Sequence, residues 1–364
     1  MGKYCRARVL SVDYRLAPEY TFPIPLNDVI SAYLSLIQPP ADSGEPAYRP
    51  EQIIFMGDSA GGGLALACAL WLRDDSRFPM PGGLVLFSPW LDLTHSLPSW
   101  RLNNPFDYLP DASTDPKHIT TTRSHYYISH NQDLKNPYVS PLFATTHHKH
   151  PLPPILIQCG DAEKLRDESI VFTTDVMKHQ QNVQLELYED MVHVFQMWAG
   201  VEAIAKYALK RAGAWVLRLG GEGEDGEVLE VPDSPKAVTE DMGGTLPSNG
   251  NGYVVGAEAL NLWANERVVR ILKPERNGKL GVFPVKHPMR IVDEAREILV
   301  ARGQWEGTKK GGRPALSRGA SHFVTPTFVM NQDQSVKEEL DKLAIQVNPE
   351  VNKEEHSDSS DLDM

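Results

Sequence analysis

The sequence predicts an α/β fold, in which a mostly parallel β-sheet carries helices on both faces. Three observations lead to this class. Short β-rich runs alternate with helical stretches as far as residue 219. Some runs, such as 52–57, are continuously apolar, which is typical of strands buried on both faces. Hydrophobic residues make up 41% of the 364 residues, which is enough for a sizeable core.

Each expected strand is a short apolar or alternating run, and each expected helix spaces its apolar residues along one face or is apolar throughout. In chain order we expect a strand at 8–13, a helix at 27–37, a strand at 52–57, a helix at 60–72, strands at 83–87 and 154–158, a helix at 165–181, a strand at 183–188 and a helix at 201–217.

Two regions depart from this alternation of strands and helices. Residues 90–152 are rich in proline and aromatic side chains, and we expect a lid-like or cap-like insertion into a domain that spans 1–219. Residues 220–364 are expected to form a largely irregular C-terminal extension. Its expected parts are linkers at 220–226 and 248–252, short helices at 260–272 and 289–301, and a disordered acidic tail at 354–361.

Composition excludes several classes of protein. The formal net charge of -12 argues against a nucleic-acid binder, which usually has a basic face. No stretch approaches the roughly 18 uncharged apolar residues of a membrane span, and the N-terminus has no secretory pattern. We therefore expect a soluble chain. Its oligomeric state is not predicted.

The cysteines and histidines indicate neither a disulfide framework nor a metal. The chain has 3 cysteines, an odd number without CxxC spacing, so we expect a reducing, cytoplasmic location. Cys68 and Cys159 lie in apolar runs and are predicted to be buried. The histidines at 147–150 have no cysteine or carboxylate nearby, which favours a solvated loop. No metal or cofactor is expected.

The residues Gly57-Asp58-Ser59-Ala60-Gly61 match the G-x-S-x-G nucleophile elbow. An apolar strand ends at Gly57 and a helix follows Ser59, which is the context that the motif requires. A side chain at either flanking glycine is expected to collide with backbone. Ser59 is thus the predicted nucleophile, and the N–H of Ala60 is the predicted oxyanion donor at the positive end of a helix.

Other motifs occur in a characteristic order around this elbow. They are Val12-Asp13-Tyr14-Arg15-Leu16-Ala17-Pro18-Glu19, Phe22-Pro23, Asp28, Gly57-Asp58-Ser59-Ala60-Gly61-Gly62, Ser88-Pro89-Trp90 and Ser140-Pro141-Leu142. Together they resemble the hormone-sensitive-lipase-like branch of the α/β-hydrolases, the α/β-hydrolase fold-3 family. The resemblance spans about residues 9–217.

The resemblance implies a Ser–acid–His triad in that chain order. The family's acid opens a D-x-L-x-D-E pattern, and the matching position here is Glu163, with Asp161 and then Asp167 as alternatives. Glutamate can also orient an imidazole and stabilise its charged form. The base is His193, which follows the last predicted strand of the domain by a few residues.

This triad implies acyl transfer, with a carboxylic ester hydrolysed through an acyl-enzyme. The expected substrates are small, lipid-like or steroid-like acyl esters, and removal of an acetyl group is one option. The aromatic insertion is expected to supply an apolar pocket, with Trp90 and Tyr126 as the predicted substrate-binding residues.

One element of the family is not found. The family carries an H-G-G-G loop before the VDYRLAPE strand, and its N–H groups are the other oxyanion donors. Here 8 residues precede Val9 and none forms that loop. We therefore expect a truncated or mis-started product with a gap in its sheet. The alternative is a catalytically impaired hydrolase-like protein.

Overall fold

The computed structural model describes residues 1–75, 77–110, 119–146, 148–179, 181–220, 268–271 and 282–304. Its helices are α1 (Gly2–Cys5), α2 (Ile24–Ile37), α3 (Ser59–Asp74), α4 (Ser99–Leu102), α5 (Arg166–Lys178), α6 (Ala203–Leu219) and α8 (Met289–Ala301). Its strands are β1 (Ile54–Asp58), β2 (Gly83–Phe87), β3 (Ile155–Gly160), β4 (Val183–Tyr188), β5 (Val268–Ile271) and β6 (Val282–Pro284). Short 3₁₀ turns lie at Pro50–Gln52, Asn131–Lys135, Pro141–Phe143 and, as η4, at Phe195–Trp198.

The six strands form one sheet in the order β1-β2-β3-β4-β5-β6. Strands β1 to β5 are parallel, and β6 is antiparallel to β5. The register places Asp58 beside Phe87, and Gly160 beside Tyr188. The carboxyl ends of β1 to β4 therefore lie along one edge of the sheet.

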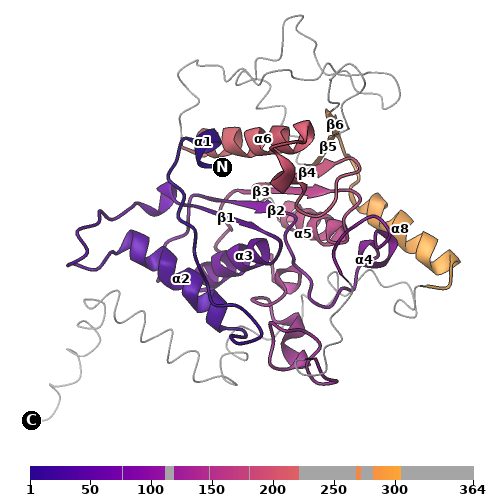
Figure 1. Ribbon diagram of the computed structural model, residues 1–364, viewed down its shortest axis with the longest axis horizontal. Coiled ribbons are helices and arrows are strands. Elements are labelled where there is room, and N and C mark those ends of the chain that lie inside the picture. The colour runs from indigo at the N-terminus through magenta and orange to yellow at the C-terminus, as the bar shows by residue number, and fades with distance from the viewer. Residues whose placement is uncertain are drawn as a thin grey trace, which may run out of the picture.

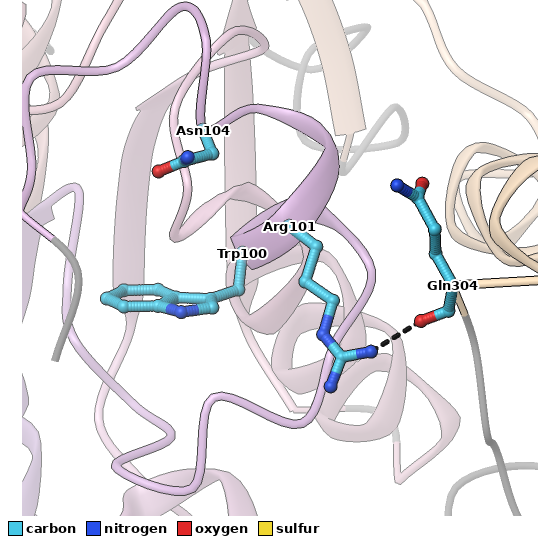
Figure 2. Close-up of a pocket in the computed structure, with 4 residues that line it drawn as sticks. All are labelled: Trp100, Arg101, Asn104 and Gln304. Carbon is cyan, nitrogen blue, oxygen red and sulfur yellow. Dashed lines mark hydrogen bonds between the residues drawn. The ribbon is translucent and has the colours of Figure 1, made fainter.

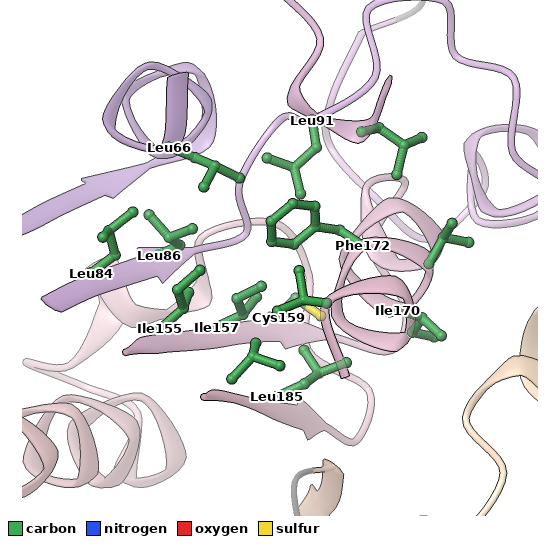
Figure 3. Packing of buried hydrophobic residues seen from close by; sticks show 14 of the residues in the cluster. Leu66, Leu84, Leu86, Leu91, Ile155, Ile157, Cys159, Ile170, Phe172 and Leu185 are labelled. Atoms are coloured by element: carbon green, nitrogen blue, oxygen red, sulfur yellow. The ribbon is translucent and has the colours of Figure 1, made fainter. Parts of the chain in front are cut away.

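Helices cover both faces of this sheet (Figure 1). On one face, Leu84 and Leu86 of β2 pack in the main core with apolar residues of α3 and α5, as Figure 3 shows. On the other face, Val85 and Phe87 pack against Trp215 of α6. Because successive residues of a strand point to opposite faces, β2 must be apolar throughout to be buried on both. The predicted α/β class, a mostly parallel sheet with helices on both faces, is confirmed.

The expected elements agree closely with the structure. The strands at 83–87 and 183–188 and the helix at 289–301 have the predicted limits, and the other elements in 27–217 shift by a few residues at their ends. Cys68 and Cys159 are both fully buried, as predicted. The insertion at 90–152 contains short helical turns in its described parts.

The strand predicted at 8–13 is wrong, because this segment is irregular chain. Val9 and Leu10 are 67% and 60% exposed. A strand is stable only where its backbone N–H and C=O groups find partners. Among the described strands, β1 pairs with β2 alone. The segment thus forms no ladder with any described strand.

The helix predicted at 260–272 is also wrong in its described part, since Val268–Ile271 form strand β5. Val268, Val269 and Ile271 are buried, and β-branched residues favour a strand that packs against a sheet edge. Strands β5 and β6 come from the region predicted as an extension, and they continue the same sheet. Helix α8, from the same region, packs against α5. The domain limits stay a prediction.

Several expectations concern residues outside the described part of the chain. They are the linkers at 221–226 and 248–252, the first part of the 260–272 helix, and the acidic tail at 354–361. Of the helices that the structure describes, none has both the length and the apolar character needed to cross a bilayer.

Candidate active site

Four side chains gather where parallel strands end. Ser59 directly follows β1 and Ser88 directly follows β2, while Glu163 and His193 lie in the loops after β3 and β4. In open α/β sheets, ligands bind at the carboxyl ends of the strands. The strand topology therefore places the predicted nucleophile, acid and base at the same edge of the sheet.

Ser59 occupies a sharp strand-to-helix turn, with a backbone φ of 52°. Positive φ is uncommon outside glycine and is found where surrounding contacts hold the residue in place. One such contact is the N–H of Trp90, which donates to the Ser59 carbonyl oxygen at 2.9 Å. A Cβ at Gly57 would lie 2.3 Å from the carbonyl oxygen of Gly61. The turn therefore requires glycine at position 57.

The expectation that Gly61 is sterically required is wrong. A Cβ there would have Tyr14 Oη as its nearest neighbour, at 3.9 Å, which is ordinary contact. The close approach occurs two residues later, where a Cβ at Gly63 would lie 2.2 Å from the carbonyl oxygen of Trp90. The loop after β2 runs directly over this part of α3.

The Nε2 of His193 lies 2.9 Å from the Oγ of Ser59, within hydrogen-bond distance. His193 is only 2% exposed. Its loop contains Asp190 and Val194, whose φ angles are 54° and 46°. These left-handed residues fold the chain back after β4, so that the imidazole reaches the serine.

Glu163 is fully buried on the other side of the imidazole, with its Oε1 3.8 Å from the Nδ1 of His193. This distance is too long for a hydrogen bond, and within the described residues neither atom has another hydrogen-bond partner. The Oε2 of Glu163 accepts from Ser88 Oγ at 2.7 Å and from the Gly160 N–H at 2.8 Å. The carboxylate is thus fixed with one oxygen facing the imidazole.

The two alternative acids are engaged elsewhere. Asp161 forms an ion pair with Arg270 and accepts from the N–H of Asp190, each at 2.7 Å. Asp167 accepts from the Arg166 side chain at 2.8 Å and from the N–H of Ser99 at 2.9 Å. Among the three carboxylates, only Glu163 faces the imidazole of His193.

Sequence reasoning gave no role to Ser88, although its motif was recognised. This buried hydroxyl donates to Glu163 and accepts from the N–H of Val194 at 3.0 Å, so it ties the acid to the loop of the base. Its position directly after a buried strand was the available signal. Tyr108 was also missed: its hydroxyl donates to the carbonyl oxygen of His193 at 2.9 Å.

Ala60 lies in the first turn of α3 and is exposed. The first N–H groups of a helix have no intrahelical partner and carry a partial positive charge. The Ala60 N–H therefore has no intrahelical partner, and its role as an oxyanion donor stays a prediction.

The predicted substrate-binding residues occupy different surroundings. The Trp90 ring stacks on His95, with centroids 5.6 Å apart and planes at 13°. His95 stacks in turn on Trp100 at 3.4 Å, and burial lowers the pKa of His95 to about 3, with His125 and Lys164 adding to the effect. Tyr126 is half-buried, and its carbonyl oxygen accepts from Arg123 at 2.7 Å. A role in substrate binding stays a prediction for both residues.

A hollow of about 470 Å³ lies between α4 and the chain after α8. Its lining residues are Trp100, Arg101, Asn104 and Gln304, and Arg101 donates to the Gln304 carbonyl oxygen at 2.5 Å (Figure 2). None of them belongs to the predicted triad. Trp100 links this hollow to the stack that contains Trp90.

No group of three or more histidine, cysteine or acidic side chains in the described ranges is arranged to hold a metal. His148 lies 3.8 Å from an Asp74 oxygen, and its ring nitrogen accepts from the His150 N–H at 3.2 Å. His147 is outside the described residues.

A family profile described as the alpha/beta hydrolase fold matches residues 1–197. The chain belongs to the α/β-hydrolase fold-3 family. The resemblance inferred from the VDYRLAPE and elbow motifs is therefore confirmed.

Proteins similar to this α/β-hydrolase include an esterase and an acetyl-hydrolase. An esterase from Acinetobacter venetianus is 35% identical over 202 residues, which are 56% of this chain and 61% of that protein. An acetyl-hydrolase from Streptomyces hygroscopicus is 31% identical over 235 residues, 61% of this chain and 69% of that protein. The chain thus spans about three fifths of the length of the first of these relatives.

Solved structures of esterases are also similar to this chain. EstE5, determined after soaking with p-nitrophenyl butyrate, is 33% identical, with a TM-score of 0.52 over 60% of this chain and 68% of that one. An esterase of the bacterial hormone-sensitive lipase family is also 33% identical, with a TM-score of 0.51 over 60% of this chain and 67% of that one.

Proposed function

We propose that this α/β-hydrolase is a serine carboxylic-ester hydrolase, with Ser59 as nucleophile, His193 as base and Glu163 as acid. The observation that carries the proposal is the 2.9 Å approach of His193 Nε2 to Ser59 Oγ at a nucleophile elbow. The esterase and acetyl-hydrolase relatives support the same chemistry.

In the proposed reaction, His193 Nε2 takes the hydroxyl proton while Ser59 Oγ bonds to the ester carbonyl carbon. The carbonyl oxygen becomes an oxyanion beside the Ala60 N–H. The C–O bond to the alcohol then breaks, and His193 returns the proton to the departing oxygen. Water, deprotonated by the same imidazole, attacks the acyl-enzyme, and the carboxylic acid leaves as Ser59 recovers its proton.

Glu163 would orient the imidazole and stabilise its charged form. Catalytic hydrogen bonds are often long in substrate-free enzymes and tighten in the complex, which fits the 3.8 Å separation from Nδ1. Glu163→Gln should lower kcat by up to about 10⁴-fold, as expected when an acid that orients a catalytic histidine loses its charge. Asp167→Asn should have a much smaller effect. Equal losses in the two variants would remove Glu163 from this role.

The proposed substrates are small, lipid-like or steroid-like acyl esters, including acetyl esters. Exposed apolar side chains beside His193 support an apolar substrate group. Tyr108 is 53% exposed, Met197 66% and Trp198 37%. The Tyr108 ring lies 6.0 Å from the His193 ring and 5.9 Å from that of Trp198.

A second candidate is a hydrolase-like protein of low turnover. Among the described residues we assign one oxyanion donor, the Ala60 N–H. In enzymes of this type, losing one donor lowers kcat by about 10²- to 10³-fold. A complete fold with slow turnover would favour this candidate.

The test is hydrolysis of p-nitrophenyl acetate and p-nitrophenyl butyrate by the full chain, with Ser59→Ala and His193→Ala. Ser35→Ala is the matched control, since Ser35 is exposed on α2. We expect hydrolysis by the parent and by the control, and only background rates in the two site variants. A parent rate equal to that of Ser59→Ala would overturn the esterase proposal.

A further inference from the structure

Strand β5 lies against β4, the strand that leads into the loop of His193 (Figure 1). Pairing continues beyond the end of β4, because the Glu189 N–H donates to the Ile271 carbonyl oxygen at 2.8 Å. Residues 268–271 therefore border the start of the base loop. They lie outside residues 1–197, which the family profile matches.

One side chain of β5 reaches the acid loop as well. The Nη2 of Arg270 lies 2.7 Å from Asp161 Oδ2. The other oxygen of the same carboxylate, Oδ1, accepts from the N–H of Asp190 at 2.7 Å. Arg270, Asp161 and the Asp190 backbone therefore form a continuous chain of contacts from β5 through the acid loop to the base loop.

Beside these contacts, the acid and base loops also touch through their backbones. The Ala162 N–H donates to the carbonyl oxygen of Met191 at 3.2 Å. A Cβ at Gly160 would lie 1.9 Å from that same oxygen, so no side chain separates the loops there. Asp161 is two residues before Glu163, and Asp190 is three residues before His193.

We propose that Arg270 is a positioning residue for the catalytic loops: it orients the Asp161 carboxylate, which holds the base loop at Asp190. The proposal rests on the proposed triad only for its effect on catalysis. It gives strand β5 a specific role in the site.

The partial exposure of this ion pair distinguishes a positioning role from a general effect on stability. The side chains of Arg270 and Asp161 are 45% and 19% exposed, so their ion pair contributes little to global stability. Small displacements of catalytic groups, in contrast, can change rates strongly. Loss of Arg270 should therefore alter loop order and turnover more than the melting temperature.

The test is amide hydrogen exchange of peptides covering 186–195 in the full chain, compared between the parent, Arg270→Gln and Arg270→Lys. Arg290→Gln is the matched control, because Arg290 forms an exposed pair with Glu294 on α8. We expect Arg270→Gln to speed exchange at Asp190 and its neighbours several-fold, Arg270→Lys to restore much of the protection, and the control to match the parent. Exchange in Arg270→Gln equal to that of the parent would overturn the proposal.

Kinetics of ester hydrolysis provide the second readout. Arg270→Gln should lower kcat by about three- to tenfold with little change in KM. In a protein that already carries Asp161→Asn, Arg270→Gln should lower kcat almost no further, because the ion pair between the two residues is already lost. Fully additive losses would contradict coupling through Asp161. If exchange responds but the parent hydrolyses no ester, the positioning role stands and the proposed function fails.

Discussion

The imidazole of His193 and the hydroxyl of Ser59 lie 2.9 Å apart although 134 residues separate them in the chain. The sheet explains this approach. Both residues follow parallel strands whose carboxyl ends lie at one edge, and left-handed backbone at positions 59, 190 and 194 turns each loop toward the site.

Gly57 and Gly61 should respond differently to alanine. Gly57→Ala places a Cβ 2.3 Å from backbone and should destabilise the fold by about 1–3 kcal/mol, as overpacking does. Gly61→Ala has room, and its stability should stay within about 1 kcal/mol of the parent. Urea unfolding of both variants measures the difference. Equal losses would show that the elbow is not packed as described.

Ser88→Ala should weaken the support of the acid. The substitution removes a hydrogen bond to Glu163 and leaves the Val194 N–H without its acceptor, which should cost about 1–3 kcal/mol of unfolding free energy. Because both loops of the site are affected, the rate of ester hydrolysis should fall as well. Ser35→Ala serves as the control in both assays. Unchanged stability and rate would remove Ser88 from this role.

The buried ion pair of Arg211 and Glu186, at 2.6 Å, links α6 to β4. Arg211→Ala would leave Glu186 buried without its counter-charge, although Tyr188 and Gln158 still donate to it. Such a loss typically costs 3–5 kcal/mol, so we expect a fall of about that size in thermal or urea unfolding. Lys206→Ala on the exposed face of α6 should change stability by less than about 0.5 kcal/mol.

Stability should depend on the protonation of Asp28. Hydrogen bonds from Arg15 hold the pKa of the Asp28 carboxyl below its usual value. The pair therefore stabilises the fold above the unfolded-state pKa, about 4, and this contribution is lost as the pH falls through the folded-state value. Because Arg15 is 50% exposed, the contribution should be about 0.5–1 kcal/mol.

Melting of Asp28→Asn from pH 7 to pH 3 tests this dependence. The deficit relative to the parent should be full at neutral pH and shrink below about pH 4. Asp42→Asn, in the exposed loop after α2, is the control. A deficit that does not change with pH would indicate that the Asp28 charge is not its cause.

Much of this architecture follows from local patterns in the sequence. The apolar run of β2, the alternating pattern of β4 and the amphipathic helix α8 could be placed because their residue patterns indicate which side chains are buried. The elbow could be placed because its glycine and its strand–helix context are local. Local patterns do not predict contacts between segments that are distant in the chain. For this reason the sequence assigned no role to Ser88, which contacts Glu163, or to Tyr108, which contacts His193.

The two wrong secondary-structure predictions have a related cause. Residues 8–13 have strand-like composition, but a strand also needs a partner, and none of the described strands pairs with this segment. Residues 268–271 gave a helical pattern in a longer window, yet they fit the free edge of β4. Whether a short apolar run becomes a strand thus depends on a partner that the run itself does not specify.

The most direct test of the account is covalent labelling of the full chain with a fluorophosphonate, followed by peptide mass spectrometry. The proposed triad predicts one label per chain, on Ser59, with no label on Ser59→Ala and much slower labelling of His193→Ala. A parent that stays unlabelled under conditions that label a reference esterase, or a label on another residue, would contradict Ser59 as the activated nucleophile.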